Sequence, residues 1–185
     1  MNKHLLAAAA LLAAVGPLAA QQIIPAQSEI VFTTRQMGVP VDGHFKRFEA
    51  QLSFDPRKAE AAKIAFTIPL ASVELGTAET EAELAKPDWF AVRQFPEASF
   101  KSTSVKPLGG GRFDVAGTLA IKGITHDVVV PVTLTQAGGT TTASGAFVVQ
   151  RLDFRIGEGE WKDTSMVAND VQVKFRFALA GVPAL

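Results

Sequence analysis

The sequence predicts an all-β protein, an extended antiparallel barrel of about eight strands with one short helix near residues 80–86. Apolar and polar side chains alternate through most of the chain after Ser28, and this period of two is typical of strands with one buried face. The links between these runs are short and rich in glycine, as at residues 109–111 and 138–139, which favours antiparallel neighbours. Because almost no helical segment interrupts the strands, a barrel or a sandwich is the expected architecture.

The strand near the C-terminus shows the clearest alternation. From Asp170 to Leu179, apolar side chains share one face and polar side chains occupy most of the other. These ten residues span roughly 33 Å when extended at about 3.3 Å each, and a tilt of about 40° leaves roughly 25 Å along a barrel axis. The other predicted strands cover residues 29–35, 41–54, 64–69, 98–103, 112–122, 126–135 and 143–150.

One segment departs from the alternation and predicts the helix. Residues 80–86 are acidic and rich in alanine, Thr80 precedes Glu83 by the spacing of a capping box, and Pro87 ends the segment. An aromatic connection follows at residues 88–96. Two interpretations of this connection stay open: a plug that only adds core to one barrel end, or an entrance lip that contacts a ligand.

The beginning of the chain has the layout of a secretory signal. A basic start at Lys3 precedes an apolar run from Leu5 to Val15, and small residues end at Ala20. This run is shorter than the about 20 residues that a membrane-spanning helix needs, and no other segment is apolar enough to cross a membrane. We therefore expect residues 1–20 to be a cleaved signal peptide and residues 21–185 to form one exported, periplasmic domain without a membrane span. An uncleaved anchor is the alternative.

The composition argues against several function classes. Lysine and arginine number 18 and so do aspartate and glutamate, so the net charge is zero and nucleic acid is not expected as a partner. The absence of cysteine excludes disulfides, thiolate catalysis and cysteine-based metal sites. His44 and His126 are isolated, which makes a weak case for a metal. Since no nucleophile elbow or phosphate-binding loop is present, we predict no catalytic residues, no metal and no cofactor.

The chemistry of this chain therefore lies in its apolar surface. The inward-facing positions predict either a solid core or a lined cavity, and periodicity does not separate the two. Gly117, Ala143 and Gly145 also face inward, where small residues either leave room for a ligand or let the strands bend. The candidate lining residues are Phe32, Phe45, Phe54, Phe66, Ile68, Phe90, Phe100, Phe113, Gly117, Leu119, Val130, Phe147, Val173, Phe175 and Phe177.

Six short sequence motifs occur in order at residues 28–32, 43–48, 52–56, 84–102, 117–125 and 151–157. In order and spacing they resemble the YceI-like family of polyisoprenoid-binding, lipocalin-resembling periplasmic proteins, over nearly all of the chain after residue 20. The resemblance implies an eight-stranded lipocalin-like barrel around a hydrophobic pore that holds a long isoprenoid lipid without catalysis. Gln36 departs from the family, whose members often carry histidine there, so the choice of lipid headgroup is left open.

We therefore predict an exported binding protein, not an enzyme, that holds a polyisoprenoid or quinone-like lipid in an apolar lumen as carrier or reservoir. Burying about 500 Å² of tail contributes about 12 kcal/mol at roughly 25 cal/mol/Å², before ordering and association costs. Two alternatives stay open: an enzyme on an apolar substrate that uses His126 or a carboxylate, and a solid-core barrel that serves respiratory or stress machinery as a protein-interaction module. The oligomeric state is also open, a dimer included.

Overall fold

The computed structural model describes residues 21–185, so the predicted signal peptide lies outside the described residues. This part of the chain is mostly β-structure, and every strand pair in it is antiparallel. The strands are β1 (Gln22–Ile23), β2 (Glu29–Gln36), β3 (Val39–Phe45), β4 (Glu49–Ser53), β5 (Lys63–Pro69), β6 (Val73–Glu74), β7 (Glu97–Gly109), β8 (Arg112–Ile121), β9 (Ile124–Ala137), β10 (Thr140–Gln150) and β11 (Asp170–Ala180).

The helices of the described chain are short. They are the α-helix α1 (Ala78–Leu84) and the 3-10 helices η1 (Pro25–Gln27), η2 (Pro56–Ala61), η3 (Leu70–Ser72), η4 (Arg151–Phe154) and η5 (Gly159–Lys162). The predicted fold class, an antiparallel all-β protein with one short α-helix, is confirmed.

The number of strands differs from the expected eight, because the sheet formed by residues 21–185 contains eleven. The alternation predicts residues 41–54 as one strand, but the structure divides them into β3 and β4. The backbone leaves the ladder at Lys46, whose N–H donates to the carbonyl of Ser72 (2.9 Å). The remaining additions, β1 and β6, have two residues each, too short for a periodic pattern to reveal.

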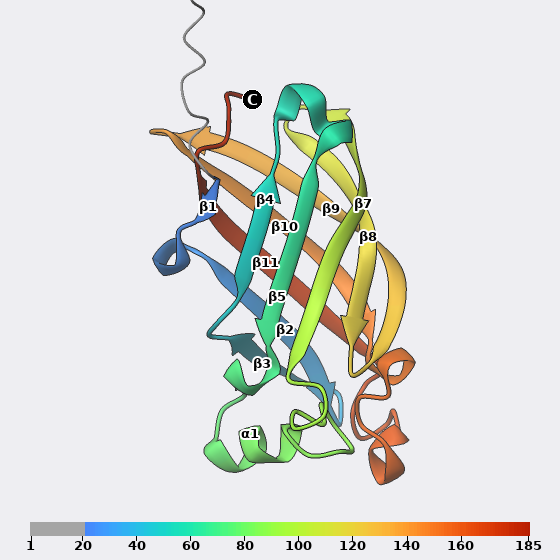
Figure 1. Ribbon diagram of the computed structural model, residues 1–185. Coiled ribbons are helices and arrows are strands. Elements are labelled where there is room, and N and C mark those ends of the chain that lie inside the picture. Colours follow the sequence, from blue (N-terminus) through green and yellow to red (C-terminus); the bar gives the residue numbers. More distant parts are fainter. Residues whose placement is uncertain (1–20) are drawn as a thin grey trace, which may run out of the picture.

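The strands form one sheet that curls around a long axis (Figure 1). The order along the sheet is β4-β5-β7-β8-β9-β10-β11-β2-β3-β6, and β1 pairs with β11 beside this path. Within residues 21–185 no ladder joins β4 to β6, so the predicted barrel is a curled half-barrel with one unpaired seam.

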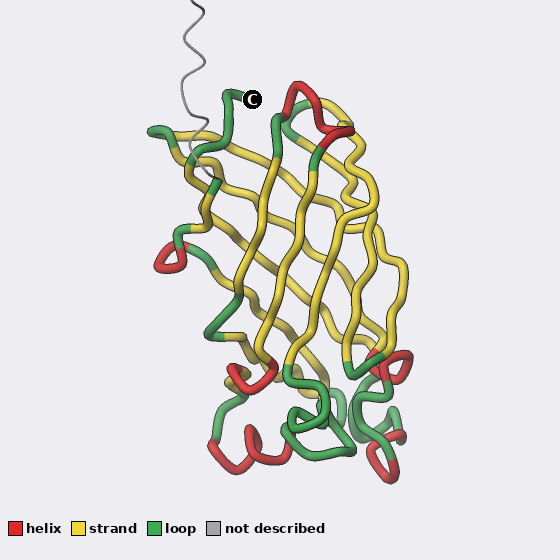
Figure 2. Tube along the Cα trace, in the orientation of Figure 1, coloured by secondary structure: helices red, strands yellow, loops and turns green. Residues whose placement is uncertain are grey.

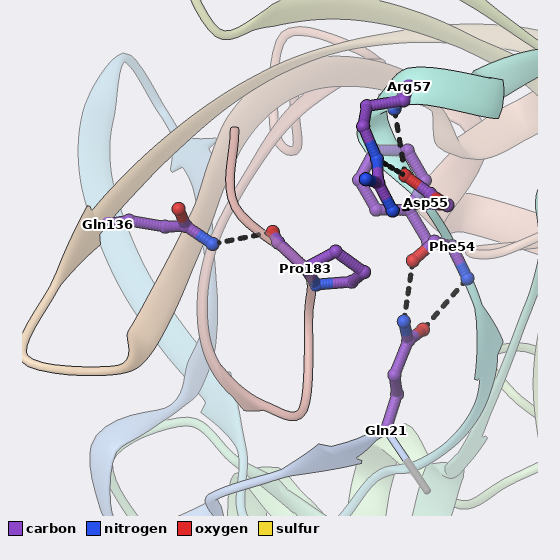
Figure 3. A network of polar contacts seen from close by, with 6 residues as sticks. All are labelled: Gln21, Phe54, Asp55, Arg57, Gln136 and Pro183. Atoms are coloured by element: carbon purple, nitrogen blue, oxygen red, sulfur yellow. Dashed lines mark hydrogen bonds and ion pairs between the residues drawn. The ribbon is translucent and has the colours of Figure 1, made fainter. Parts of the chain in front are cut away.

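Side-chain hydrogen bonds cross the seam near one end. The amide of Gln21 accepts from the N–H of Phe54 (2.8 Å) and donates to the carbonyl of Phe54 (2.5 Å), as a neighbouring strand would (Figure 3). Asp55 then caps η2 by accepting from the N–H of Arg57 (3.0 Å). The start of the described chain is thereby tied to the end of β4.

The connections between strands gather at the two ends of the half-barrel (Figures 1 and 2). Helix α1 lies at one end together with η4 and η5, and η2 lies at the other end with the C-terminus. We call these the α1 end and the η2 end. The buried apolar residues form two clusters, one around Leu84 and Trp89 and one around Phe113 and Leu179.

Helix α1 begins two residues before the predicted helix at residues 80–86. Its N-cap is Thr77, whose Oγ1 accepts from the N–H of Thr80 (3.3 Å), so Thr80 lies inside the helix instead of capping it. Leu84 is the buried residue of the helix and packs into the core of the α1 end.

Lys122 is buried, although the alternation places it on the outer face. It has a left-handed backbone (φ 51°), and its Nζ donates to the carbonyl of Arg155 (2.7 Å) and to the carboxylate of Glu158 (3.0 Å). The hydrogen bond from Lys122 holds the pKa of the Glu158 carboxyl below its ordinary value. The turn between β8 and β9 is thereby attached to the loop after η4.

This ion pair should make stability depend on pH. We expect Glu158→Gln to lower the free energy of unfolding by at most about 1 kcal/mol at pH 7, because Glu158 is partly exposed. A carboxyl whose pKa is lower in the folded state stabilises above its ordinary pKa, and this contribution is lost as the pH falls through the folded pKa. The difference between wild type and variant should therefore shrink below about pH 5 in urea unfolding. An unchanged difference, or the same difference for the exposed control Glu160→Gln, would contradict the assignment.

Candidate functional site

A long apolar cavity of about 650 Å³ runs inside the curled sheet. Its wall is built by inward-facing residues of most strands, together with residues from α1 and from the loops at the α1 end. This volume is in the range of sites that hold one small organic molecule. Of the two possibilities left open by periodicity, the structure favours the lined cavity over the solid core.

Fourteen of the fifteen candidate lining residues lie in this wall. They are Phe32, Phe45, Phe54, Phe66, Ile68, Phe90, Phe100, Phe113, Leu119, Val130, Phe147, Val173, Phe175 and Phe177. Their contact with a ligand stays a prediction. The alternation located all of them except Phe90, which lies in the aromatic connection after α1, because an inward-facing strand position looks the same in sequence whether it meets core or cavity.

Gly117 does not belong to the wall, because a ring from the neighbouring strand covers it. A Cβ at this position would lie 2.6 Å from Cζ of Phe100 and 2.5 Å from the carbonyl oxygen of Lys101. Real Cβ atoms do not approach other atoms so closely, and the position therefore requires glycine. The expectation that Gly117 lines the lumen and leaves space for a ligand is wrong.

The same arrangement recurs at two directly opposed cross-strand pairs. Gly145 of β10 faces Phe175 of β11, and Gly43 of β3 faces Phe32 of β2. In both pairs a Cβ on the glycine would collide with the phenylalanine ring. The glycine thus allows the ring to lie over the neighbouring backbone, a known way to stabilise glycine in sheets. Of the three small inward residues, Ala143 is the one that reaches the cavity.

The cavity reaches the surface at the α1 end. Its wall there includes the exposed side chains of Met37 and Glu79 and the half-buried side chain of Gln36. Phe90 also lies in the wall and packs on Phe45, with ring centroids 6.4 Å apart. The aromatic connection after α1 therefore both adds core and borders the cavity.

Phenylalanine rings line the cavity toward the η2 end. Phe177 stacks on Phe66 (centroids 4.6 Å apart) and on Phe175 (5.1 Å). Phe54 meets Phe113 edge to face, with centroids 5.4 Å apart and planes at 84°. This half of the wall is apolar and offers a ligand packing contacts.

Sequence reasoning missed three polar residues in the wall. Arg151, Thr34 and Trp89 line the cavity, and each is more than nine-tenths buried. Thr34 shares the inward parity of Ile30 and Phe32, so the alternation contained a signal for it. Arg151 follows a predicted strand, where an arginine is ordinarily solvent-exposed, and only the tertiary contacts reveal its burial.

Arg151 is a buried cation held by backbone carbonyls. Its five N–H groups donate, at 2.6–3.3 Å, to the carbonyls of Ala168, Ile156, Gly157, Trp161 and Val167. The full donor capacity of the guanidinium is thereby used. Burial lowers the pKa of Arg151 from its ordinary value, and arginine stays charged at neutral pH. The side chain fastens the loop between β10 and β11 to the barrel.

The two histidines of the described chain lie outside the cavity. His126 is exposed and its Nε2 lies 3.1 Å from the carbonyl oxygen of Asp153, and His44 pairs with Glu74 on the outer face (2.6 Å). The carboxylates that do line the cavity, Glu79 and Glu83, lie at its mouth. Within residues 21–185, no three metal-ligating side chains gather. No helix of that part of the chain has both the length and the apolar character to cross a bilayer.

A curled antiparallel half-barrel around a long apolar cavity that reaches the surface at the α1 end is an architecture that holds a ligand. A family model described as a YceI-like domain matches residues 21–179. The chain belongs to this family, which confirms the resemblance seen in the sequence.

Similar proteins support this membership. The crystal structure of BcnA from Burkholderia cenocepacia is 42% identical, with a TM-score of 0.82, and the match covers 86% of this chain and 99% of BcnA. A UPF0312 protein from Azotobacter vinelandii is 34% identical over 125 residues, and the match spans 65% of the length of each protein. A polyisoprenoid binding domain from Saccharophagus degradans, 15% identical with a TM-score of 0.71, shares the fold over 89% of this chain and 99% of that domain.

Proposed function

We propose that this protein binds a long-chain polyisoprenoid lipid, polyprenyl or quinone-like, in its cavity and acts as a carrier or reservoir. The observation that carries the proposal is the apolar cavity of about 650 Å³ that reaches the surface at the α1 end. An isoprenoid tail has no polar groups, so burying it against phenylalanine and aliphatic side chains is favourable without any hydrogen bond. The description of the Saccharophagus degradans neighbour as a polyisoprenoid binding domain supports the same ligand class.

Export to the periplasm is part of the proposal. Residues 1–20 have the three-part layout of a cleaved secretory signal, and cleavage after Ala20 would place Gln21 at the new N-terminus. Intact-mass measurement of exported protein should therefore give a chain that begins near Gln21. A mass that retains Met1 would contradict cleavage.

Extraction of the protein from its native host tests the ligand. Purified protein is treated with organic solvent, and the extract is examined by mass spectrometry. An isoprenoid lipid in stoichiometric amount is the expected result. An extract that contains no such lipid would favour the interaction-module alternative over a carrier.

Substitutions at two neighbouring residues should show whether the lipid contacts the cavity wall or the outer surface of the sheet. Val173 lies in the wall between Phe32 and Phe147 of the adjacent strands, whereas Lys174 is exposed. An aspartate in the apolar wall loses several kcal/mol of hydration or takes up a proton. We therefore expect Val173→Asp to reduce retained lipid far more than Lys174→Asp. Retention is measured only for variants that circular dichroism shows to be folded, and equal retention by both would contradict a ligand in the cavity.

A further inference from the structure

Two buried side-chain atoms have no hydrogen-bond partner within residues 21–185. They are Oγ1 of Thr34, on β2, and Nε1 of Trp89, in the connection after α1. Thr34 is 8% exposed and Trp89 is 9% exposed, and both side chains line the cavity. Buried polar groups almost always have a partner, and an unpaired one destabilises the fold. Both atoms lack a partner but are covered by neighbouring atoms, so bonding to a molecule in the cavity requires each side chain to rotate toward it.

A chain of contacts places the two residues at the same end of the cavity. The Cζ atom of Arg151 lies 6.0 Å from the ring centroid of Trp89, and Arg151 donates to the carbonyl of Val167 (2.6 Å). Val167 forms a β-bridge with Gln36, which lies on β2 two residues after Thr34. Gln36 borders the mouth, so both unpaired atoms lie in the α1 half of the cavity.

We propose that Thr34 and Trp89 bind the headgroup of the lipid, with the tail directed toward the η2 end. This inference rests on the proposed function. The indole N–H of Trp89 can only donate, so the headgroup must present an acceptor oxygen. The hydroxyl of Thr34 can donate to a second acceptor or accept from a hydroxyl. The phenylalanine-lined half beyond them suits the tail, because it offers apolar contacts.

The surrounding charges indicate which headgroup fits. The positive charge of Arg151, whose N–H groups are occupied by carbonyls, favours oxygen atoms with partial negative charge. Glu79 and Glu83 line the mouth and repel a full negative charge. The combination fits a neutral headgroup with carbonyl oxygens, as in a quinone, better than a phosphate.

Three probes and two substitutions test the headgroup site. Squalene is a polyisoprenoid without a headgroup, a menaquinone with a tetraprenyl tail carries carbonyls, and geranylgeranyl phosphate carries a phosphate. Trp89→Phe removes the N–H but keeps an aromatic ring, and Thr34→Val removes the hydroxyl but keeps the shape. We expect each substitution to weaken menaquinone binding by about tenfold more than it weakens squalene binding.

The matched control is Thr33→Val, on the outer face of β2, where the hydroxyl of Thr33 bonds to Asp42. It should leave the affinity for both lipids unchanged. Lipid-free Thr34→Val protein should melt no lower than wild type, because it loses an unpaired buried polar atom. Trp89→Phe should melt lower, because the smaller ring leaves a void in the core. A marked drop in melting temperature for Thr34→Val would assign its hydroxyl a structural role and overturn the proposal.

Fluorescence gives an independent measure of headgroup position. The chain has two tryptophans, so Trp89 is the sole one in a Trp161→Phe background. Menaquinone should quench this emission at stoichiometric ratio and squalene should not. The absence of quenching by bound menaquinone would place the headgroup elsewhere and overturn the proposal.

The remaining outcomes separate this inference from the proposed function. Wild-type menaquinone affinity in both Trp89→Phe and Thr34→Val would overturn the headgroup site, while squalene binding would still support a lipid cavity. Failure of the wild-type protein to bind either squalene or menaquinone would overturn the proposed function itself. Tighter binding of geranylgeranyl phosphate than of menaquinone would overturn the neutral headgroup class.

Discussion

Arg151→Met should lower the free energy of unfolding by at least about 3 kcal/mol or prevent folding, because it leaves five carbonyls, three of them buried, without their donor. A loss of this size corresponds to a fall in melting temperature of about 10 °C for a domain of this length. Arg151→Lys should lose less, because it keeps the charge and three of the donors. Thermal and urea unfolding of the lipid-free proteins measure both changes.

Arg176→Met is the matched control for this experiment. Arg176 lies exposed on β11 and makes an ion pair with Glu29 (3.3 Å). Its replacement should change the stability by less than about 0.5 kcal/mol. Similar losses for Arg151→Met and Arg176→Met would show that the carbonyl contacts of Arg151 do not hold the loop.

Gly117→Ala should lower the free energy of unfolding by about 2 kcal/mol, although it adds only one methyl group. The new Cβ would meet the carbonyl oxygen of Lys101, which belongs to the β7–β8 ladder, and the ring of Phe100. The ring can rotate away at some cost, but the carbonyl cannot move without breaking the ladder. Thermal unfolding of the lipid-free protein measures the change.

A double-mutant cycle identifies the cause of this loss. In a Phe100→Leu background the ring no longer covers Gly117. Gly117→Ala should therefore lower the free energy of unfolding by less in that background, although the contact with Lys101 remains. Thr118→Ala, a change at the next residue of β8, should have a small effect. An alanine variant as stable as wild type would contradict the close contact and restore the interpretation of Gly117 as ligand space.

Much of the fold follows from patterns that a single strand carries. Alternation over residues 170–179 predicted β11 to within one residue, because a strand with one buried face must repeat every two positions. The division of residues 41–54 into two strands is also visible in the sequence pattern. Phe45 and Leu52 are an odd number of positions apart, so one regular strand cannot place both on the same face.

The amino-acid sequence by itself determined the antiparallel all-β class, the short helix and which strand positions face inward, since each depends on neighbours along the chain. Only the tertiary structure decided that the inward faces enclose a cavity and that β4 and β6 do not pair. It also decided that Arg151 and Lys122 are buried and that a ring covers Gly117. These features depend on how the chain folds back on itself, as the 156–168 loop does around Arg151 and the Phe100 ring does over Gly117. Local periodicity contains no information about such approaches.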